Sequence, residues 1–165
     1  MGEPVFLLDA NVFIEAARRY YAFDLVPRFW DSLVEYASLG RIRSIDRVKH
    51  ELERGKDELA SWVEGYFQDA FASTDEDEVV QIYKKIIKWV NSESQFTEEA
   101  KATFAGGADG WLVAYAKVKG CIVVTQEISE PFSKRKVKIP DVCIKGGLSF
   151  LDTFEMLRTL GIRLG

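Results

Sequence analysis

Near its beginning the chain reads Val5-Phe6-Leu7-Leu8-Asp9, four apolar residues that end at an acid. An apolar run without alternation, followed by a helical pattern over residues 12–19, predicts a buried strand that leads directly into a helix. Asn11 is the predicted N-cap of that helix. A second apolar run, Ile122-Val123-Val124-Thr125, lies far along the chain. Two such runs separated by helical patterns predict parallel strands that are covered on both faces.

The rest of the chain is dominated by helical patterns. Thr74, by its spacing to Asp77, is expected to cap one of these helices. Further helices are expected at 24–38, 48–52, 57–71, 74–90, just after 97, 109–116 and 149–160, and further strands at 41–44, 138–139 and 142–144. We therefore predict one domain over residues 1–165, a three-layer α/β/α fold with a central parallel sheet and a helix-rich middle segment.

Composition sets limits on the class of protein. A length of 165 residues with 47% hydrophobic content suits a single domain with a sizeable core. No apolar stretch approaches the length of a membrane span, and the N-terminus lacks the basic start of a signal peptide, so we expect a cytoplasmic protein without membrane contact. Cys121 and Cys143 are expected to be buried free thiols.

The charge argues against a general nucleic-acid binder. The net charge is −4 and the pI is near 5.2, whereas such binders normally present a basic face to the phosphates. Cations do gather in the first third of the chain and in the loop Ser133 to Lys138. Ordinary solvated surface explains each cluster at least as well.

Four acids are harder to explain by packing: Asp9, Glu51, Asp109 and Glu127. Asp9 and Glu127 follow the two apolar runs, at the edge where open α/β sheets place their ligands. Glu51 and Asp109 lie on or at the start of predicted helices whose neighbours face the core. Each also has an ordinary interpretation: a helix cap for Asp9 and Asp109, surface decoration for Glu51, and a turn for Glu127.

If the four acids converge, their repulsion must be relieved by protonation or by cations. The set is rich in carboxylate oxygen, with no histidine cluster and no thiolate partner, which favours Mg²⁺ or Mn²⁺ over zinc. The lone histidine, His50, lies about 100° around the helix from Glu51 and is interpreted as incidental. A bound divalent ion can activate water and stabilise charge on a phosphodiester, which reconciles an acidic protein with a phosphate substrate.

The sequence resembles the PIN-domain nucleases, a family similar to the toxin ribonucleases of toxin-antitoxin pairs. The matching stretches, in the family's order, are Phe6 to Ile14, Ser44 to Leu52, Ala108 to Ala116 and Val123 to Glu127. The resemblance implies a parallel sheet wrapped by helices and a metal-dependent endoribonuclease that cleaves single-stranded RNA. It also implies an antitoxin partner that covers the cleft, and a homodimer.

Residue by residue, the resemblance places Asp9, Glu51 and Asp109 at the three acids of the metal site. Glu127 stands where the family more often has aspartate, which leaves open whether a second metal binds. Asn11 and Thr125 match polar positions that orient the site.

Two other functions stay open. A haloacid dehalogenase-like phosphatase shares an apolar strand ending in aspartate, but it needs a second aspartate where Asn11 stands. A PIN-like scaffold that binds RNA or protein without catalysis is the other, and Glu127 together with the acidic pI favours it.

Overall fold

A parallel five-stranded sheet forms the centre of the molecule. The computed structural model describes residues 2–165. The strand order is β3-β2-β1-β4-β5, and every pairing is parallel. The strands are β1 (Phe6–Leu8), β2 (Ile42–Ile45), β3 (Phe71–Ala72), β4 (Ile122–Val124) and β5 (Phe150–Leu151). The predicted sheet is therefore confirmed, and its first strand takes the central place.

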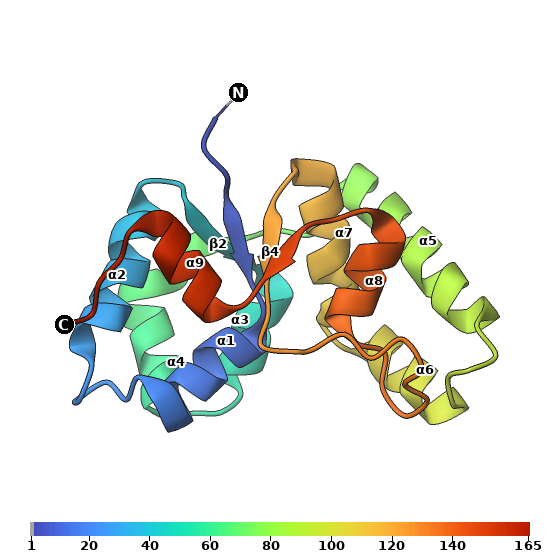
Figure 1. Cartoon of the computed structure of the whole chain (residues 1–165), viewed down its shortest axis with the longest axis horizontal. Helices are drawn as coiled ribbons and strands as arrows, with labels where there is room; N and C mark the ends of the chain where they lie inside the picture. Colours follow the sequence, from blue (N-terminus) through green and yellow to red (C-terminus); the bar gives the residue numbers. More distant parts are fainter. Residues whose placement is uncertain (1) are drawn as a thin grey trace.

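Helices cover both faces of this sheet. In Figure 1, α1, α2, α4 and α9 lie on one side of the strands, and α5, α6, α7 and α8 lie on the other. The helices are α1 (Ala10–Glu15), α2 (Pro27–Ser38), α3 (Asp46–Glu53), α4 (Glu58–Trp62), α5 (Asp77–Ser92), α6 (Glu98–Gly106), α7 (Asp109–Lys119), α8 (Ile139–Gly146) and α9 (Thr153–Leu160). This is the three-layer α/β/α arrangement expected from the sequence, with the helix-rich segment in its middle.

The apolar run of β1 explains why that strand is central. Phe6, Leu7 and Leu8 are all fully buried, because β2 and β4 flank the strand and helices cover both of its faces. An aromatic cluster packs on one side, with Phe13 contacting Phe67 at a ring separation of 5.7 Å. A strand that is covered on both faces needs side chains that are apolar without alternation, as this run provides.

The two strands predicted near the C-terminal end are wrong. Residues 138–139 and 142–144 belong to helix α8 and to the residue before it. Pro140 lies in the first turn of that helix, and Gly147 ends it with a φ of 70°, a conformation that glycine adopts readily. Ile139, Val142 and Cys143 share one buried face at helical spacing, and so short an apolar pattern does not distinguish a helix from strands.

Two predicted helix caps are also wrong. Helix α1 begins at Ala10, so Asn11 lies in its first turn, and Asp9 holds the N-cap position without a side-chain capping bond. Helix α5 begins at Asp77 with Glu76 at its N-cap. Thr74 is buried and donates its hydroxyl to Asp46 Oδ1 over 2.8 Å, which ties it to α3.

The predicted helix over residues 57–71 is interrupted. After α4 the chain forms a wider π-helical turn, Val63–Phe67, and then a tighter 3₁₀ turn, Gln68–Ala70. Strand β3 follows directly, and the sequence did not predict it because its first residue falls within the helical pattern. Strand β5 falls within the residues expected to form the closing helix, which begins only at Thr153.

Cys121 and Cys143 are buried free thiols, as expected. Cys143 lies in α8, where burial raises its pKa to about 12. Across residues 2–165, none of the helices is both long enough and apolar enough to cross a membrane.

Candidate acidic site

The sheet brings two of the predicted acids to one edge. Asp9 follows β1 and Glu127 follows β4, and these strands are paired in parallel with Leu8 opposite Val124. The backbone N–H of Asp9 continues the ladder by donating to the carbonyl of Val124 over 3.0 Å. The carboxyl ends of parallel strands share one edge, so the two acids are neighbours although they are far apart in sequence.

Asp109 and Glu51 reach the same place from helices. Asp109 is the first residue of α7, and Glu51 lies on α3, which directly follows β2. The charges of Asp109, Glu127 and Glu51 all raise the pKa of Asp9, with Glu51 contributing least. The charges of the three other acids thus all act on Asp9, and that of Glu51 has the smallest effect.

Asp9 is the most deeply buried of the four, with 3% of its surface exposed. Burial and then the neighbouring carboxylates raise its pKa well above the ordinary value, because a buried negative charge among other negative charges is costly. Thr125 opposes this effect by donating its hydroxyl to Asp9 Oδ2 over 3.0 Å. The threonine expected to orient the site is thus in contact with its central acid.

The pKa of Asp109 is raised as well. Burial, followed by the charge of Glu127, raises its pKa to about 6. Lys136 acts in the opposite direction and Glu51 adds to the rise. Both aspartates therefore keep their protons to a higher pH than ordinary aspartates do.

Glu127 has a different environment, because its carboxylate already has partners. Oε1 accepts the backbone N–H of Ile139 over 2.8 Å. Oε2 forms an ion pair with the ammonium of Lys136 and has no other partner among the described residues. The Glu127 side chain is only 6% exposed, so this ion pair closes over an almost buried carboxylate.

Two pockets lie beside the site, one next to Glu51 and the other next to Glu127. A pocket of about 350 Å³ beside Glu51 and Ala108 is lined by the cations Arg47 and Arg54 and by His50. Arg47 is held over the ring of Trp111 at 3.9 Å. These cations line the pocket together with Glu51, on the α3 side of the site.

A second pocket of about 300 Å³ lies on the other side of the site. Asn11, Gln126, Glu127 and Lys136 are among its lining residues. Asn11 is thus near the acids as expected, although it caps no helix. The sequence had not indicated Lys136 as a site residue, and its only signal was membership of the basic run from Ser133 to Lys138.

The residues fit a divalent cation by chemistry rather than by preformed geometry. The available donors are carboxylate oxygens under mutual repulsion, which a hard cation would relieve. Within residues 2–165, however, no group of three or more His, Cys, Asp or Glu side chains is arranged so that it could hold a metal ion. Both oxygens of Glu127 are already engaged, Oε1 by the N–H of Ile139 and Oε2 by Lys136, which takes this carboxylate out of the set.

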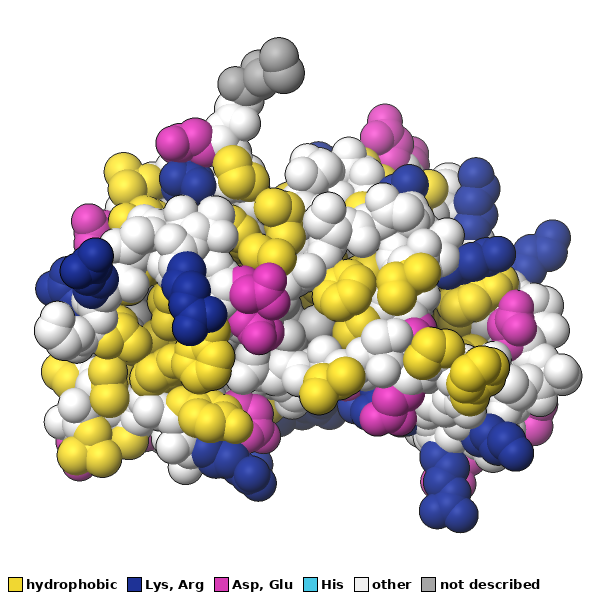
Figure 2. All heavy atoms as spheres, in the orientation of Figure 1, with side chains coloured by type: hydrophobic (Ala, Val, Ile, Leu, Met, Phe, Trp, Pro, Cys, Tyr) yellow, Lys and Arg dark blue, Asp and Glu magenta, His cyan; other side chains and the backbone are white. Residues whose placement is uncertain are grey.

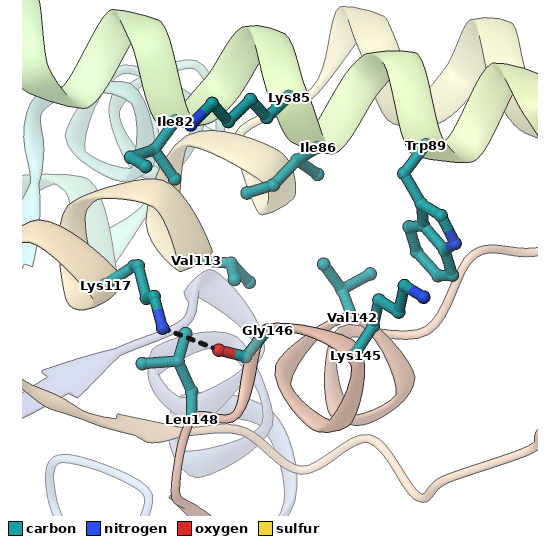
Figure 3. Close-up of a pocket in the computed structure, with 10 residues that line it drawn as sticks. All are labelled: Ile82, Lys85, Ile86, Trp89, Val113, Lys117, Val142, Lys145, Gly146 and Leu148. Carbon is teal, nitrogen blue, oxygen red and sulfur yellow. Dashed lines mark hydrogen bonds between the residues drawn. The ribbon is translucent and has the colours of Figure 1, made fainter.

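The most apolar pocket lies elsewhere and contains no acid. Figure 3 shows this space of about 250 Å³ between α5, α7 and α8, where Ile86, Val113 and Val142 project inward. Lys117 lies at its edge and donates to the carbonyl of Gly146 over 2.9 Å. On the face drawn in Figure 2, Lys and Arg side chains are scattered among acids and form no continuous basic surface.

Comparison with known proteins places the chain in a family. A model described as "Domain of unknown function (DUF4411)" matches residues 6–164. The chain belongs to the DUF4411 family. Curated proteins give no match to this DUF4411 protein.

Solved structures show what its fold resembles. One is the crystal structure of FitAcB from Neisseria gonorrhoeae, with 21% identity, a TM-score of 0.56, and coverage of 89% of this chain and 96% of that one. Another is VapBC2 from Rickettsia felis bound to a DNA fragment from its promoter, with 13% identity, a TM-score of 0.57, and coverage of 90% and 98%. A third is FitAB bound to the IR36 DNA fragment, with 18% identity, a TM-score of 0.51, and coverage of 90% and 94%. At such identities the similarity shows the fold alone, and that fold is PIN-like.

Proposed function

We propose that this DUF4411 protein is a Mg²⁺- or Mn²⁺-dependent endoribonuclease that hydrolyses phosphodiester bonds of single-stranded RNA. The observation that carries this proposal is Asp9, which is buried at the carboxyl edge of a parallel sheet and whose pKa is raised by burial and then by the charges of Asp109 and Glu127. Perturbed carboxylates of this kind are typical of functional sites. The resemblance of the surrounding segments to PIN-domain nucleases supports the same reaction.

Asp9, Asp109 and Glu51 would hold the ion, with Glu127 as a neighbour whose oxygens are already engaged. When bound, the ion supplies an activated water and stabilises charge on the phosphodiester. Thr125 fixes one oxygen of Asp9, so the carboxylate presents its other oxygen to the cleft in a defined orientation. Asp9 and Asp109 must lose their protons to act as ligands, and cation binding is therefore expected to release protons.

The cationic pocket beside Glu51 would bind the substrate backbone. Arg47 is held in place by Trp111, so its guanidinium loses little freedom when it meets a phosphate. Arg54 lines the same pocket. A local group of cations next to the acids provides phosphate contacts even though the whole protein is acidic.

We further propose that this nuclease is the toxin of a toxin-antitoxin pair and acts in the cytoplasm, as a homodimer with an antitoxin protein. The support is the fold that it shares with the FitAB and VapBC2 complexes. Coexpression with the protein encoded beside it, followed by copurification, tests the pairing.

A second candidate function is an inactive PIN-like scaffold that binds RNA or protein. The observation in its favour is that no three acids are already arranged to hold a metal ion within residues 2–165. The haloacid dehalogenase-like phosphatase gains no such support, since Asn11 lines the site where its second aspartate would be needed.

Cleavage of a single-stranded RNA in Mn²⁺ separates these functions. We expect the wild type to cut internal bonds and Asp9→Asn to lose more than the roughly 10- to 100-fold typical of changes behind the metal ligands. Asp69→Asn is the matched control, since Asp69 is exposed and remote in the sequence from all four site segments. Wild-type protein that binds RNA but leaves it uncut would establish the scaffold instead.

A further inference from the structure

The loop that joins β4 to α8 carries a lysine, Lys136, whose ammonium group lies at the acidic site. Residues 128–138 contain no helix or strand, yet Lys136 returns from this loop to pair with Glu127 Oε2. The Lys136 side chain is 50% exposed, while the Glu127 side chain is only 6% exposed. The ammonium therefore sits at the mouth of the site, between the carboxylate and solvent.

Lys136 acts on more than one acid. Its positive charge is stabilised by Asp109 and Asp9 as well as by Glu127, and it reciprocally favours the charged form of Asp109. The ammonium of Lys136, paired with Glu127 Oε2, takes the place that a divalent ion would need on that oxygen. The pocket lined by Asn11, Glu127 and Lys136 is where that ion would otherwise meet the Glu127 side of the site.

Glu127 is held in its orientation from both of its oxygens. The N–H of Ile139, the first residue of α8, binds Oε1, and the ammonium binds Oε2. To coordinate a divalent ion, Glu127 would have to release Lys136. A lysine cation and a divalent ion compete for the same oxygen because two cations at one buried carboxylate repel each other.

We propose that Lys136 is a built-in counter-cation that occupies the Glu127 half of the site, so that the protein binds one divalent ion, through the Asp9 and Asp109 half, instead of two. This inference rests on the proposed function, because it concerns the ion of that same site. It assigns Lys136 a positioning role: it neutralises Glu127 and leaves the other acids to the ion.

A purely structural role for Lys136 is the competing explanation. In that case the ion pair would only fasten the loop to β4, and its loss would loosen the loop without creating a place for metal. The two explanations differ in the number of ions that the protein binds once the ammonium is removed. Activity alone does not separate them.

Titration calorimetry with Mn²⁺ on the full chain provides the test. We expect one ion in the wild type, and a second ion in Lys136→Met because Glu127 Oε2 then loses its ammonium partner and is free to bind a hard cation. Lys136→Arg keeps a cation and should stay at one ion. Lys134→Met is the matched control from the same loop, since Lys134 is exposed and forms no ion pair among the described residues.

Three results overturn the proposal. Two ions in the wild type would show that Lys136 blocks nothing. A Lys136→Met protein that is folded by circular dichroism and still binds one ion with wild-type affinity would leave only the structural role. If neither protein binds Mn²⁺, both the counter-cation and the metal-dependent function fail, whereas one ion that is lost in Asp9→Asn and unaffected by Lys136→Met refutes the counter-cation alone.

Discussion

The two halves of the acidic site show the same kind of group in opposite circumstances. Asp9 is buried and Asp109 partly buried, and burial followed by the charges of neighbouring carboxylates raises the pKa of each. Glu127 is equally withdrawn from solvent, but a backbone N–H and an ammonium satisfy its oxygens. Burying a carboxylate is costly unless it is paired, and the chain itself supplies the partners of Glu127. The charges of Asp9 and Asp109 are not balanced in this way, so a proton or a bound cation would stabilise them.

The largest expected difference between the halves is in how stability responds to pH. A carboxyl group whose pKa is raised on folding binds its proton more tightly in the native state, so stability falls as the pH rises. For Asp109, with a pKa of about 6 against an ordinary value of 3.8, the loss develops between these pH values and amounts to about 3 kcal/mol. Asp9 shifts in the same direction and extends the loss.

Urea unfolding of the metal-free protein at pH 4.5 and pH 7.5 measures this response. We expect a lower free energy of unfolding at the higher pH, and a flatter dependence in Asp109→Asn, which has no proton to lose. Asp69→Asn should retain the wild-type dependence. Equal pH dependence in Asp109→Asn and the wild type would mean that the two halves do not differ as described.

Removal of the Thr125 hydroxyl sharpens the comparison, because this side chain touches both halves. Its hydroxyl donates to Asp9 Oδ2 and accepts the N–H of Glu127. Thr125→Val should raise the pKa of Asp9 further and lower the affinity for Mn²⁺ by roughly 10- to 100-fold, as is usual for groups that orient metal ligands. Thr125→Ser keeps the hydroxyl and should bind Mn²⁺ like the wild type. Equal losses in both variants would point to packing of the methyl group instead.

The sequence singled out Asp9, Glu51, Asp109 and Glu127 alike, and their roles at a site stay a prediction. Asp9 was found because a run of four apolar residues has one natural interpretation, a covered strand, and an acid at its end then has an unusual position. Asp109 stands out because it begins a helix whose next residues face the core, and Glu51 stands out mainly because its segment resembles a known family. The sheet topology brought these residues together as the parallel arrangement requires.

The features that the sequence did not indicate, Lys136 as the partner of Glu127 above all, depend on structure without a periodic pattern. Lys136 meets Glu127 through an irregular loop, and no spacing rule connects a cation to an acid nine positions earlier across such a loop. Strands β3 and β5 have two residues each, too few to show alternation. Helix α8 presents a short apolar stretch that suits either element. These features are set by tertiary contacts, which local propensity does not report.

The smallest expected effect comes from Glu127→Gln, which tests whether Glu127 belongs to the satisfied half. The amide keeps an acceptor for the N–H of Ile139 but loses the charge that pairs with Lys136. Since the lysine is half exposed, we expect the free energy of unfolding at neutral pH to fall by only about 1 kcal/mol. The first Mn²⁺ ion should bind almost as tightly as in the wild type, because its ligands lie in the other half. If calorimetry shows instead that Glu127→Gln loses Mn²⁺ as completely as Asp9→Asn does, Glu127 is a ligand of that ion. Lys136 must then move away whenever the ion binds, and the division of the site into two halves would hold only for the metal-free protein.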